Sequence, residues 1–218
     1  MKNYIKRNID HFKFTNTWFN DTAKPQWEKL VSQIKPKKIL ELGSYEGAST
    51  CYLIQKLAQE NSIEIHCIDA WNVEMGDDTD YKHYGPNVDM SEVELRFRQN
   101  TKLAIEKVSK KVDFFIHKGF SDDQLVKLLS NGKKNYFDFI YIDGSHLGPD
   151  VLCDAVLSFR LLKINGVIAF DDYLWPSANK SLTRIPKLAI DSFINLYSEK
   201  INIFNAPLYQ IYIKKISD

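Results

Sequence analysis

Apolar residues follow two alternating patterns along this chain, and the alternation predicts the order of its elements. Short continuous apolar runs are typical of strands that are buried on both faces of a parallel sheet. Such runs occur at 39–42, 63–69, 112–116, 137–142 and 167–170. Apolar residues at helical spacing indicate amphipathic helices, and they occur at 25–34, 47–57, 91–108, 121–129, 149–162 and 185–197. The chain is therefore predicted to form an α/β fold with a mostly parallel sheet.

The two ends of the chain and one internal stretch depart from this alternation. Residues 201–204 and 208–213 are both strand-like and follow each other closely, which predicts a closing antiparallel β-hairpin. Residues 1–36 form an aromatic and partly helical segment, which we interpret as a cap or lid on a main domain at 37–218. The polar stretch 71–90 is too long for a bare connection, so we expect it to be a functional flap.

Two local signals set the ends of elements. Ser91 is followed three residues later by Glu94, a pattern that predicts a capping box with Ser91 as the N-cap of the next helix. Asn165-Gly166 predicts a tight turn into the strand at 167–170.

A glycine-containing turn follows the first strand. The strand stops at Gly43, and Gly47 opens a helix, so backbone N–H groups and a positive helix end lie close to the strand's tip. This is how α/β proteins hold nucleotide-like cofactors. The Gly-x-x-x-Gly spacing lacks the third glycine of NAD sites, so a cofactor without a pyrophosphate fits better. About twenty residues further on, Asp69 ends the second strand, where an acid accepts hydrogen bonds from ribose hydroxyls.

A second group of polar residues follows the fourth and fifth predicted strands. Asp143 and His146 come after one strand, and Asp171 and Asp172 follow the other. Ligands of open parallel sheets bind beyond the carboxyl ends of the strands, so these acids are expected to converge beside the glycine turn. Three carboxylates that lie close together repel one another unless a cation joins them, and an all-oxygen set suits magnesium. Alternatively, Asp171 or Asp172 only caps the segment that follows.

Composition narrows the choice of compartment and partner. The chain has 218 residues and a formal net charge of +1, so no global field attracts nucleic acid or an anionic membrane. Its start has no apolar signal core, and no apolar run reaches membrane-spanning length. The three cysteines lie among apolar neighbours without a Cys-x-x-Cys pair, which predicts buried thiols in a reducing compartment. We therefore expect a cytoplasmic protein with a small-molecule substrate, and homo-oligomerisation stays open.

The residues named above carry a resemblance to a known family. Glu41-Leu42-Gly43 with Gly47, Ile142-Asp-Gly-Ser-His146 and Gly166-Val-Ile-Ala-Phe-Asp-Asp-Tyr173 resemble motifs of class I S-adenosylmethionine (SAM) methyltransferases, and among them the small metal-dependent O-methyltransferases of the macrocin and, more distantly, the catechol type. The resemblance implies a Rossmann-like fold with a seven-stranded, mostly parallel sheet, helices on both faces and the C-terminal hairpin. It also implies a set of SAM contacts: Glu41, Gly43, Ser44, Gly47, Ser49, Asp69, Ala70, Trp71, Gly119, Ser121 and Asp143.

The same resemblance implies Mg²⁺ ligands and a base. It assigns Asp143, Asp171 and Asp172 to the metal and His146 to proton removal from the acceptor hydroxyl, which would be a vicinal diol, a sugar or a phenol. A histidine titrates near neutral pH and suits that task. His83 in the flap is a second candidate base.

Three other classes compete with this interpretation. An NAD-dependent oxidoreductase would carry the third glycine, which this chain lacks, and its reaction would not require the three acids. A non-catalytic SAM-binding module would lose the acids or His146, and both are present. A nucleic-acid methyltransferase would need a basic face, which the charge balance does not predict. The sequence does not identify the acceptor.

Overall fold

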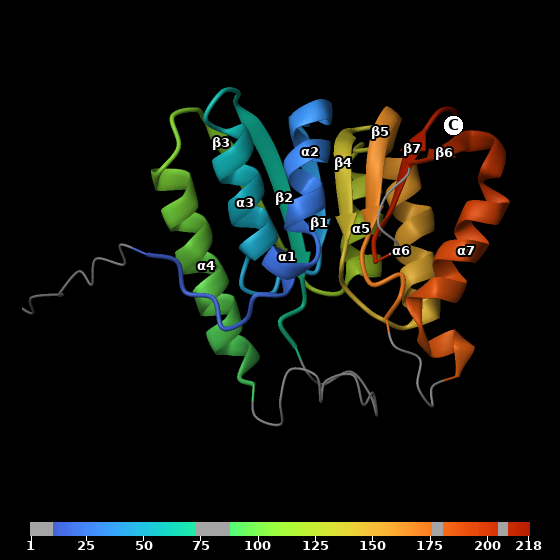
Figure 1. Cartoon of the computed structure of the whole chain (residues 1–218), viewed down its shortest axis with the longest axis horizontal. Helices are drawn as coiled ribbons and strands as arrows, with labels where there is room; N and C mark the ends of the chain where they lie inside the picture. Colours follow the sequence, from blue (N-terminus) through green and yellow to red (C-terminus); the bar gives the residue numbers. More distant parts are fainter. Residues whose placement is uncertain (1–10, 73–87, 176–180, 205–208) are drawn as a thin grey trace, which may run out of the picture.

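The structure, a computed structural model, describes residues 11–72, 88–175, 181–204 and 209–218. Within these ranges, strands and helices alternate as predicted (Figure 1). The strands are β1 (Lys38–Leu42), β2 (Ile63–Asp69), β3 (Val112–Lys118), β4 (Phe137–Ile142), β5 (Leu162–Phe170), β6 (Ile201–Ile203) and β7 (Ile211–Lys215). The α-helices are α1 (Trp18–Asp21), α2 (Lys24–Ile34), α3 (Ala48–Leu57), α4 (Met90–Glu106), α5 (Ser121–Ser130), α6 (Gly148–Leu161) and α7 (Pro186–Leu196), and the short 3₁₀ helices are η2 (Leu182–Arg184) and η3 (Ser198–Lys200).

All the described strands form one sheet in the order β3-β2-β1-β4-β5-β7-β6. The first five strands in the chain are mutually parallel, whereas β7 runs antiparallel to both β5 and β6. This confirms the predicted fold, including its antiparallel C-terminal strands. The strand order reverses between β1 and β4, and the carboxyl ends of these two strands are therefore the place where an open α/β sheet binds its ligand.

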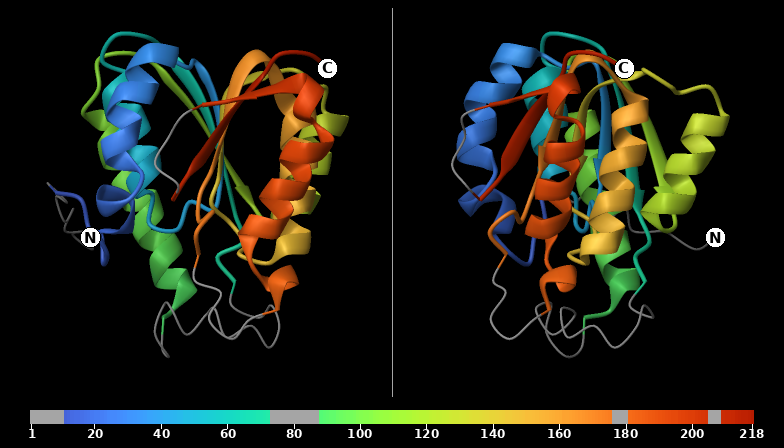
Figure 2. Two further views of the ribbon diagram at one scale, coloured as in Figure 1. Left: turned by 45° about the vertical axis from the view of Figure 1, so that its right-hand side comes forward. Right: turned by 90° about the vertical axis from the view of Figure 1, so that its right-hand side faces the viewer.

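Helices cover both faces of the sheet (Figure 2). On one face α2, α3 and α4 bury a cluster that includes Trp27, Leu53 and Phe97, and on the other α5, α6 and α7 bury a second cluster around the opposite side chains of the same strands. Neighbouring residues of β1 show the consequence, because Ile39 belongs to the first cluster and Leu40 to the second, and both are fully buried. Burial on both faces explains why the strands read as continuous apolar runs.

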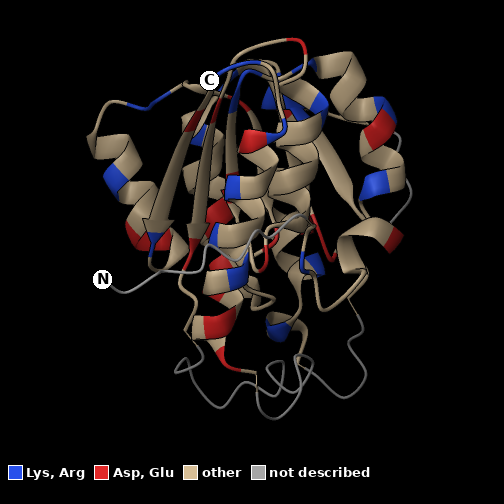
Figure 3. Ribbon diagram, turned by 90° about the vertical axis from the view of Figure 1, so that its left-hand side faces the viewer, with Lys and Arg blue, Asp and Glu red and all other residues tan. Residues whose placement is uncertain are grey.

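Acidic and basic positions are interspersed on the helices of the side that Figure 3 shows, as expected for a chain with a net charge near zero. Among the described helices, none is both long and apolar enough to cross a bilayer. The thiols of Cys51 and Cys67 are free and buried, as predicted, but Cys153 is exposed on α6, contrary to the prediction.

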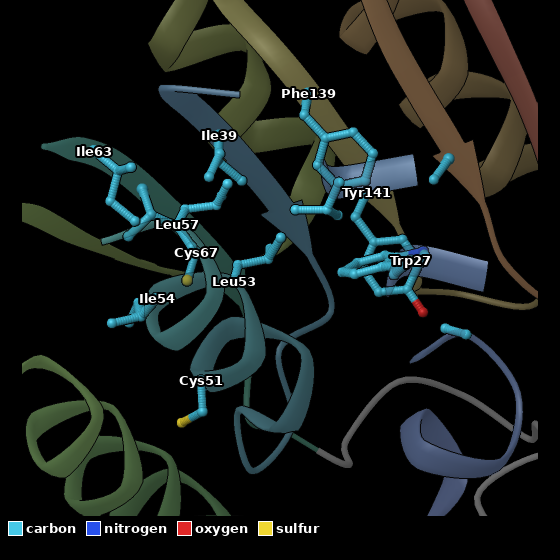
Figure 4. Packing of buried hydrophobic residues seen from close by; sticks show 14 of the residues in the cluster. Trp27, Ile39, Cys51, Leu53, Ile54, Leu57, Ile63, Cys67, Phe139 and Tyr141 are labelled. Carbon is cyan, nitrogen blue, oxygen red and sulfur yellow. The ribbon is translucent and has the colours of Figure 1, made fainter. Parts of the chain in front are cut away.

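The first cluster also positions a polar group of the site. The indole of Trp27, from α2, packs edge-on against Phe139 and Tyr141 of β4, with ring centroids 5.3 Å and 4.6 Å away (Figure 4). These aromatic contacts hold the Tyr141 ring in place. Its hydroxyl therefore lies fixed at the carboxyl end of β4, beside Asp143.

Two predicted element ends were wrong. The N-cap of α4 is Asp89, whose carboxylate accepts the Ser91 N–H at 2.9 Å, and Glu94 pairs with Arg98 instead of closing a capping box. An Asp at the N-cap is as favourable as a Ser, so the sequence offered two possible N-caps, two residues apart. The predicted turn at Asn165 lies inside β5, which pairs with β4 from Leu162 onward. Asn165 adopts a φ of 70°, and the pairing register shifts there, which is the mark of a bulge.

The hairpin and the flap are seen only in part. β6 and β7 pair antiparallel as predicted, although β7 spans 211–215 instead of 208–213. Most of the predicted flap, 73–87, and with it His83, lies outside the described residues.

Candidate active site

The glycine turn lies directly against the end of β4. Gly43 has a φ of 81° and Gly47 a φ of 82°, a backbone conformation that glycine adopts without strain. A Cβ atom on Gly43 would overlap the carbonyl oxygen of Asp143. The Asp143 N–H donates to the carbonyl of Leu42 at 2.9 Å. The turn and the tip of β4 therefore share one surface at the point where the strand order reverses.

Three predicted cofactor contacts bond to one another inside this turn. The Glu41 carboxylate is fully buried and accepts hydrogen bonds from the hydroxyls of Ser44, at 2.9 Å, Ser49 and Thr50. Burial raises the pKa of Glu41, and the hydroxyl donors oppose that rise. These side chains fasten β1, the turn and the first turn of α3 together, so Glu41, Ser44 and Ser49 shape the cofactor turn from within.

Asp69 joins the end of β2 to the same turn. Its carboxylate accepts the N–H groups of Ser44 at 2.9 Å, Tyr45 at 2.8 Å and Trp71 at 2.8 Å, while burial raises its pKa. Each carboxylate oxygen accepts two hydrogen bonds, so the oxygen that bonds only Trp71 keeps a position for a ribose hydroxyl.

The remaining predicted cofactor residues lie around this acid. Trp71 is buried, and its indole N–H donates to the carbonyl of Tyr45 at 3.0 Å, so this side chain helps to hold the backbone of the turn in place. Gly119 directly follows β3, and its N–H donates to the carbonyl of Asp69 at 3.0 Å. Ser121 begins α5, whose N–H groups point toward the same edge. Ala70, directly after Asp69, is half-buried.

The acids after β4 and β5 share a tyrosine. The Tyr141 hydroxyl lies between Asp143, at 3.0 Å, and Asp171. Burial raises the pKa of Asp143 far above its ordinary value and that of Asp171 to about 6. Neighbouring carboxylates add to these shifts, Asp171 and Asp172 to that of Asp143 and Asp172 to that of Asp171. The phenol pKa of Tyr141 is raised as well, by burial and then by the neighbouring acids. The three carboxyls therefore lie close enough to influence one another's protonation.

Asp172 faces a different partner. Its carboxylate lies 2.8 Å from Nε2 of His146 and accepts the Tyr209 hydroxyl at 3.0 Å. The ring of Trp175 lies against the imidazole, with centroids 4.2 Å apart. Asp172 has a φ of 56°, an unusual conformation for a non-glycine residue. An acid and a histidine in this relation form a pair in which the carboxylate orients the imidazole.

This arrangement does not fit a magnesium ion as the sequence predicts it. Among the described residues, no three His, Cys, Asp or Glu side chains are placed so that they could hold a metal ion together. The Tyr141 hydroxyl lies within hydrogen-bond distance of both Asp143 and Asp171, and its single proton serves one of them at a time. Asp171 also accepts the N–H of Asp172 at 3.0 Å. Asp172 itself is turned to His146. The predicted triad is thus divided between a tyrosine and a histidine.

The sequence analysis missed two hydroxyls of the site. Tyr141 lies two residues before Asp143, on the same side of the extended chain, so the strand period offered a signal for it. Tyr209 approaches Asp172 because its carbonyl accepts the Tyr173 N–H at 3.0 Å, a pairing between distant segments that carries no local signal. His66 of β2 and His117 of β3 bond to each other at 2.8 Å, and His66 is buried.

A buried acid lies behind the site. Asp154 projects from α6, is 1% exposed, and neither carboxylate oxygen has a hydrogen-bond partner among the described residues. Desolvation by burial raises its pKa to about 7, with a smaller opposing effect of the Ser121 hydroxyl. It lies next to Gly144, since a Cβ there would be 4.0 Å from Asp154 Oδ2. Ionising this group in the folded protein is costly.

An α/β sheet of this strand order, whose first strand opens into a glycine turn at the switch point, defines the Rossmann-like methyltransferase class. The sequence agrees, because the family described as "Methyltransferase domain" matches residues 40–173, well over half of the chain. The chain belongs to this family and is a methyltransferase. A comparison with curated proteins finds no match.

Solved structures share the fold. An O-methyltransferase from Bacillus cereus, in complex with SAH, is 18% identical with a TM-score of 0.61, over 88% of this chain and 79% of that one. The O-methyltransferase TomG from Streptomyces achromogenes, involved in tomaymycin synthesis and in complex with SAM, is 15% identical with a TM-score of 0.61, over 88% and 80% of the two chains. At these identities the likeness concerns the fold.

The first prediction concerns Gly43. Gly43→Ala places a methyl group on the Asp143 carbonyl in a conformation that alanine disfavours, so we expect a loss of stability of about 1–3 kcal/mol from the overlap alone. Gly132→Ala is the matched control: its φ is also positive, 77°, but a Cβ there meets nothing within 4 Å. Urea denaturation followed by circular dichroism measures both. Equal losses in the two variants would contradict the close contact of the turn with β4.

The second prediction concerns Asp154. Its pKa is about 7 in the folded protein against 3.8 for the free side chain, so between these pH values the folded state keeps a proton that the unfolded chain releases. The free energy of unfolding should therefore fall as the pH rises through this window. Asp154→Asn lacks that component, and its loss of stability between pH 4 and pH 8 should be smaller than that of the wild type. Denaturation curves at several pH values test this, and identical slopes would show that Asp154 is not buried as a free acid.

Proposed function

We propose that this chain is a SAM-dependent O-methyltransferase that acts on a hydroxyl of a small molecule. The observation that best supports this proposal is the His146–Asp172 pair beside the glycine turn of a methyltransferase fold. Two similar structures hold SAH or SAM and are O-methyltransferases, which supports the same cofactor and reaction here. Neither rival interpretation gives this pair a role. The rivals are a non-catalytic module and an NAD-dependent oxidoreductase.

The cofactor would lie across the ends of β1 and β4. Gly43 lets the turn approach the end of β4, and Gly47 lets it pack against Phe97, so both glycines shape the turn beside the cofactor. Asp69 keeps an acceptor for the ribose, and Gly119 and Ser121 lie near the same edge. When bound, SAM supplies a methyl group on a positively charged sulfur. The acid-rich end of β4 and β5 favours that charge, because Asp143 and Asp171 can release a proton there.

His146 would act as the general base. Because Nε2 faces the Asp172 carboxylate, this nitrogen carries the proton and Nδ1 keeps the lone pair. Nδ1 takes the proton of the acceptor hydroxyl while the oxygen forms its bond to the methyl carbon. The carbon–sulfur bond breaks, and its electron pair stays on the sulfur, which becomes neutral. Asp172 stabilises the imidazolium that results, and Tyr209 holds Asp172 in place.

The magnesium dependence predicted from the sequence gains no support from the side chains as they lie. Asp143 and Asp171 bind Tyr141, and Asp172 binds His146, so the route proposed above assigns every acid a role without a metal ion. It stays a prediction that a chelator tests directly.

The class of acceptor is also proposed. Trp175 covers one side of the His146 ring, and an aromatic wall next to the base suits a flat or ring-shaped acceptor. A phenol, a sugar or another vicinal diol fits this wall. The cytoplasmic location, homo-oligomerisation and the role of residues 1–36 as a cap stay predictions of the sequence.

The third prediction tests the base. His146→Ala should lower the rate of methyl transfer to a panel of catechols and sugar diols by about 10²–10⁴, because the hydroxyl proton loses its acceptor. SAM affinity, measured by calorimetry, should remain that of the wild type. His117→Ala is the matched control, because its imidazole bonds His66 on another part of the sheet.

Methylated product is detected by mass spectrometry, with and without EDTA. A wild-type rate in His146→Ala would remove this residue from the reaction. Loss of activity in EDTA that Mg²⁺ restores would support the metal-dependent form predicted from the sequence, and SAM binding without any product would support the non-catalytic module.

A further inference from the structure

A cavity of about 490 Å³ lies beside the glycine turn, on the side of α4. It is lined by the N-terminal segment, by Tyr45 of the turn and by the first turns of α4. Among the described residues that are predicted to contact the cofactor, none lines it. The described lining thus differs from the set of predicted cofactor contacts, and the volume is in the range that holds a small organic ligand.

Two buried polar side chains fix the walls of this cavity. Glu46, in the turn, accepts the N–H of Thr15 at 2.7 Å and its hydroxyl at 2.8 Å. Asn100, on α4, accepts the N–H of Lys13 at 2.8 Å and donates to the carbonyls of Lys13, at 2.9 Å, and Glu46, at 3.0 Å. Three distant parts of the chain are thus bonded together, and the cavity between them has built walls.

Acidic residues outnumber basic ones among the described residues of the lining. The charged members of that set are Asp89, Glu92 and Arg96. The guanidinium of Arg96 lies 2.6 Å from the carboxylate of Glu46, which is 1% exposed, so its charge is balanced from behind the wall. The hydrogen bonds from Ser91 hold the pKa of Asp89 below its ordinary value, which keeps that carboxylate ionised. Two carboxylates are left to set the sign of the potential inside.

Aromatic rings form the other side. Trp18 and Tyr45 both line the cavity, and their rings lie against each other with centroids 5.4 Å apart and planes inclined by 37°. Aromatic faces attract cations and stack on flat rings. Figure 3 shows the acidic positions at the N-terminal end of α4, where the described helix begins. Rings and carboxylates thus line the same space.

We propose that this cavity binds a ring compound that carries a protonated amine. The ring lies against Trp18 and Tyr45, and the ammonium group lies between Asp89 and Glu92. Neutral and anionic ring compounds lack the second interaction and bind more weakly. The inference does not rest on the proposed methyl transfer.

A ligand bound in this cavity would also influence the cofactor turn. The Tyr45 N–H donates to Asp69 at 2.8 Å, and the Tyr45 carbonyl accepts the indole N–H of Trp71 at 3.0 Å. A ligand that packs against the Tyr45 ring therefore stabilises the backbone conformation that also holds the cofactor.

The fourth prediction uses 2-phenylethylamine as the probe and 2-phenylethanol as its neutral counterpart. Each is titrated by calorimetry into the full chain saturated with SAH, so that the cofactor positions are filled. We expect the amine to bind about threefold to fivefold more tightly than the alcohol. Glu92→Gln should reduce this preference to about twofold or less, because one of two carboxylates is lost. Trp18→Ala should weaken both compounds.

Glu106→Gln is the matched control. Glu106 lies at the other end of α4 and pairs with Lys102 at 3.9 Å, away from the cavity, so the preference should stay unchanged. Equal affinity of amine and alcohol in the wild type, an unchanged preference in Glu92→Gln, or the absence of binding by either compound would overturn the proposal.

Discussion

The backbone of Gly43 lies against the carbonyl of Asp143, and the geometry of the whole site depends on this contact. It brings the end of β1 and the end of β4 to one surface, where no side chain fits between them. Glu41 and Asp69 secure it from two directions. The buried carboxylate of Glu41 gathers the hydroxyls of Ser44, Ser49 and Thr50, and Asp69 gathers the N–H groups of Ser44 and Tyr45. One buried and one half-buried carboxylate thus hold the shape of the turn.

The charges at this edge are arranged in two groups with different chemistry. The Tyr141 hydroxyl lies between Asp143 and Asp171, whose pKa values are raised by burial and by neighbouring carboxylates. Asp172 is instead committed to His146 and Tyr209. Adjacent acids in the chain thus serve separate purposes, because successive residues point in different directions.

The sequence predicted the fold well, because burial on both sheet faces leaves a strong signal in the strands, and β1, β2 and β4 read directly as apolar runs. It also predicted which residues meet at the edge, since parallel strands end together. It failed where two local solutions compete, as between Asp89 and Ser91 for the cap of α4. It also failed where partners are distant in the chain. No residue near Asp172 in the sequence predicts its contact with Tyr209, and no residue near Glu46 predicts its contacts with Thr15 and Arg96.

We propose that the glycine turn, fastened by Glu41 and Asp69, holds SAM with its methyl group toward His146. A crystal structure of the chain with SAH would test this arrangement. We expect the ribose to bond Asp69, the amino-acid part to follow the turn from Gly43 to Gly47, and the sulfur to face the His146 imidazole, with Tyr141 still between Asp143 and Asp171. SAH bound elsewhere, or a sulfur on the far side of the turn from His146, would contradict it.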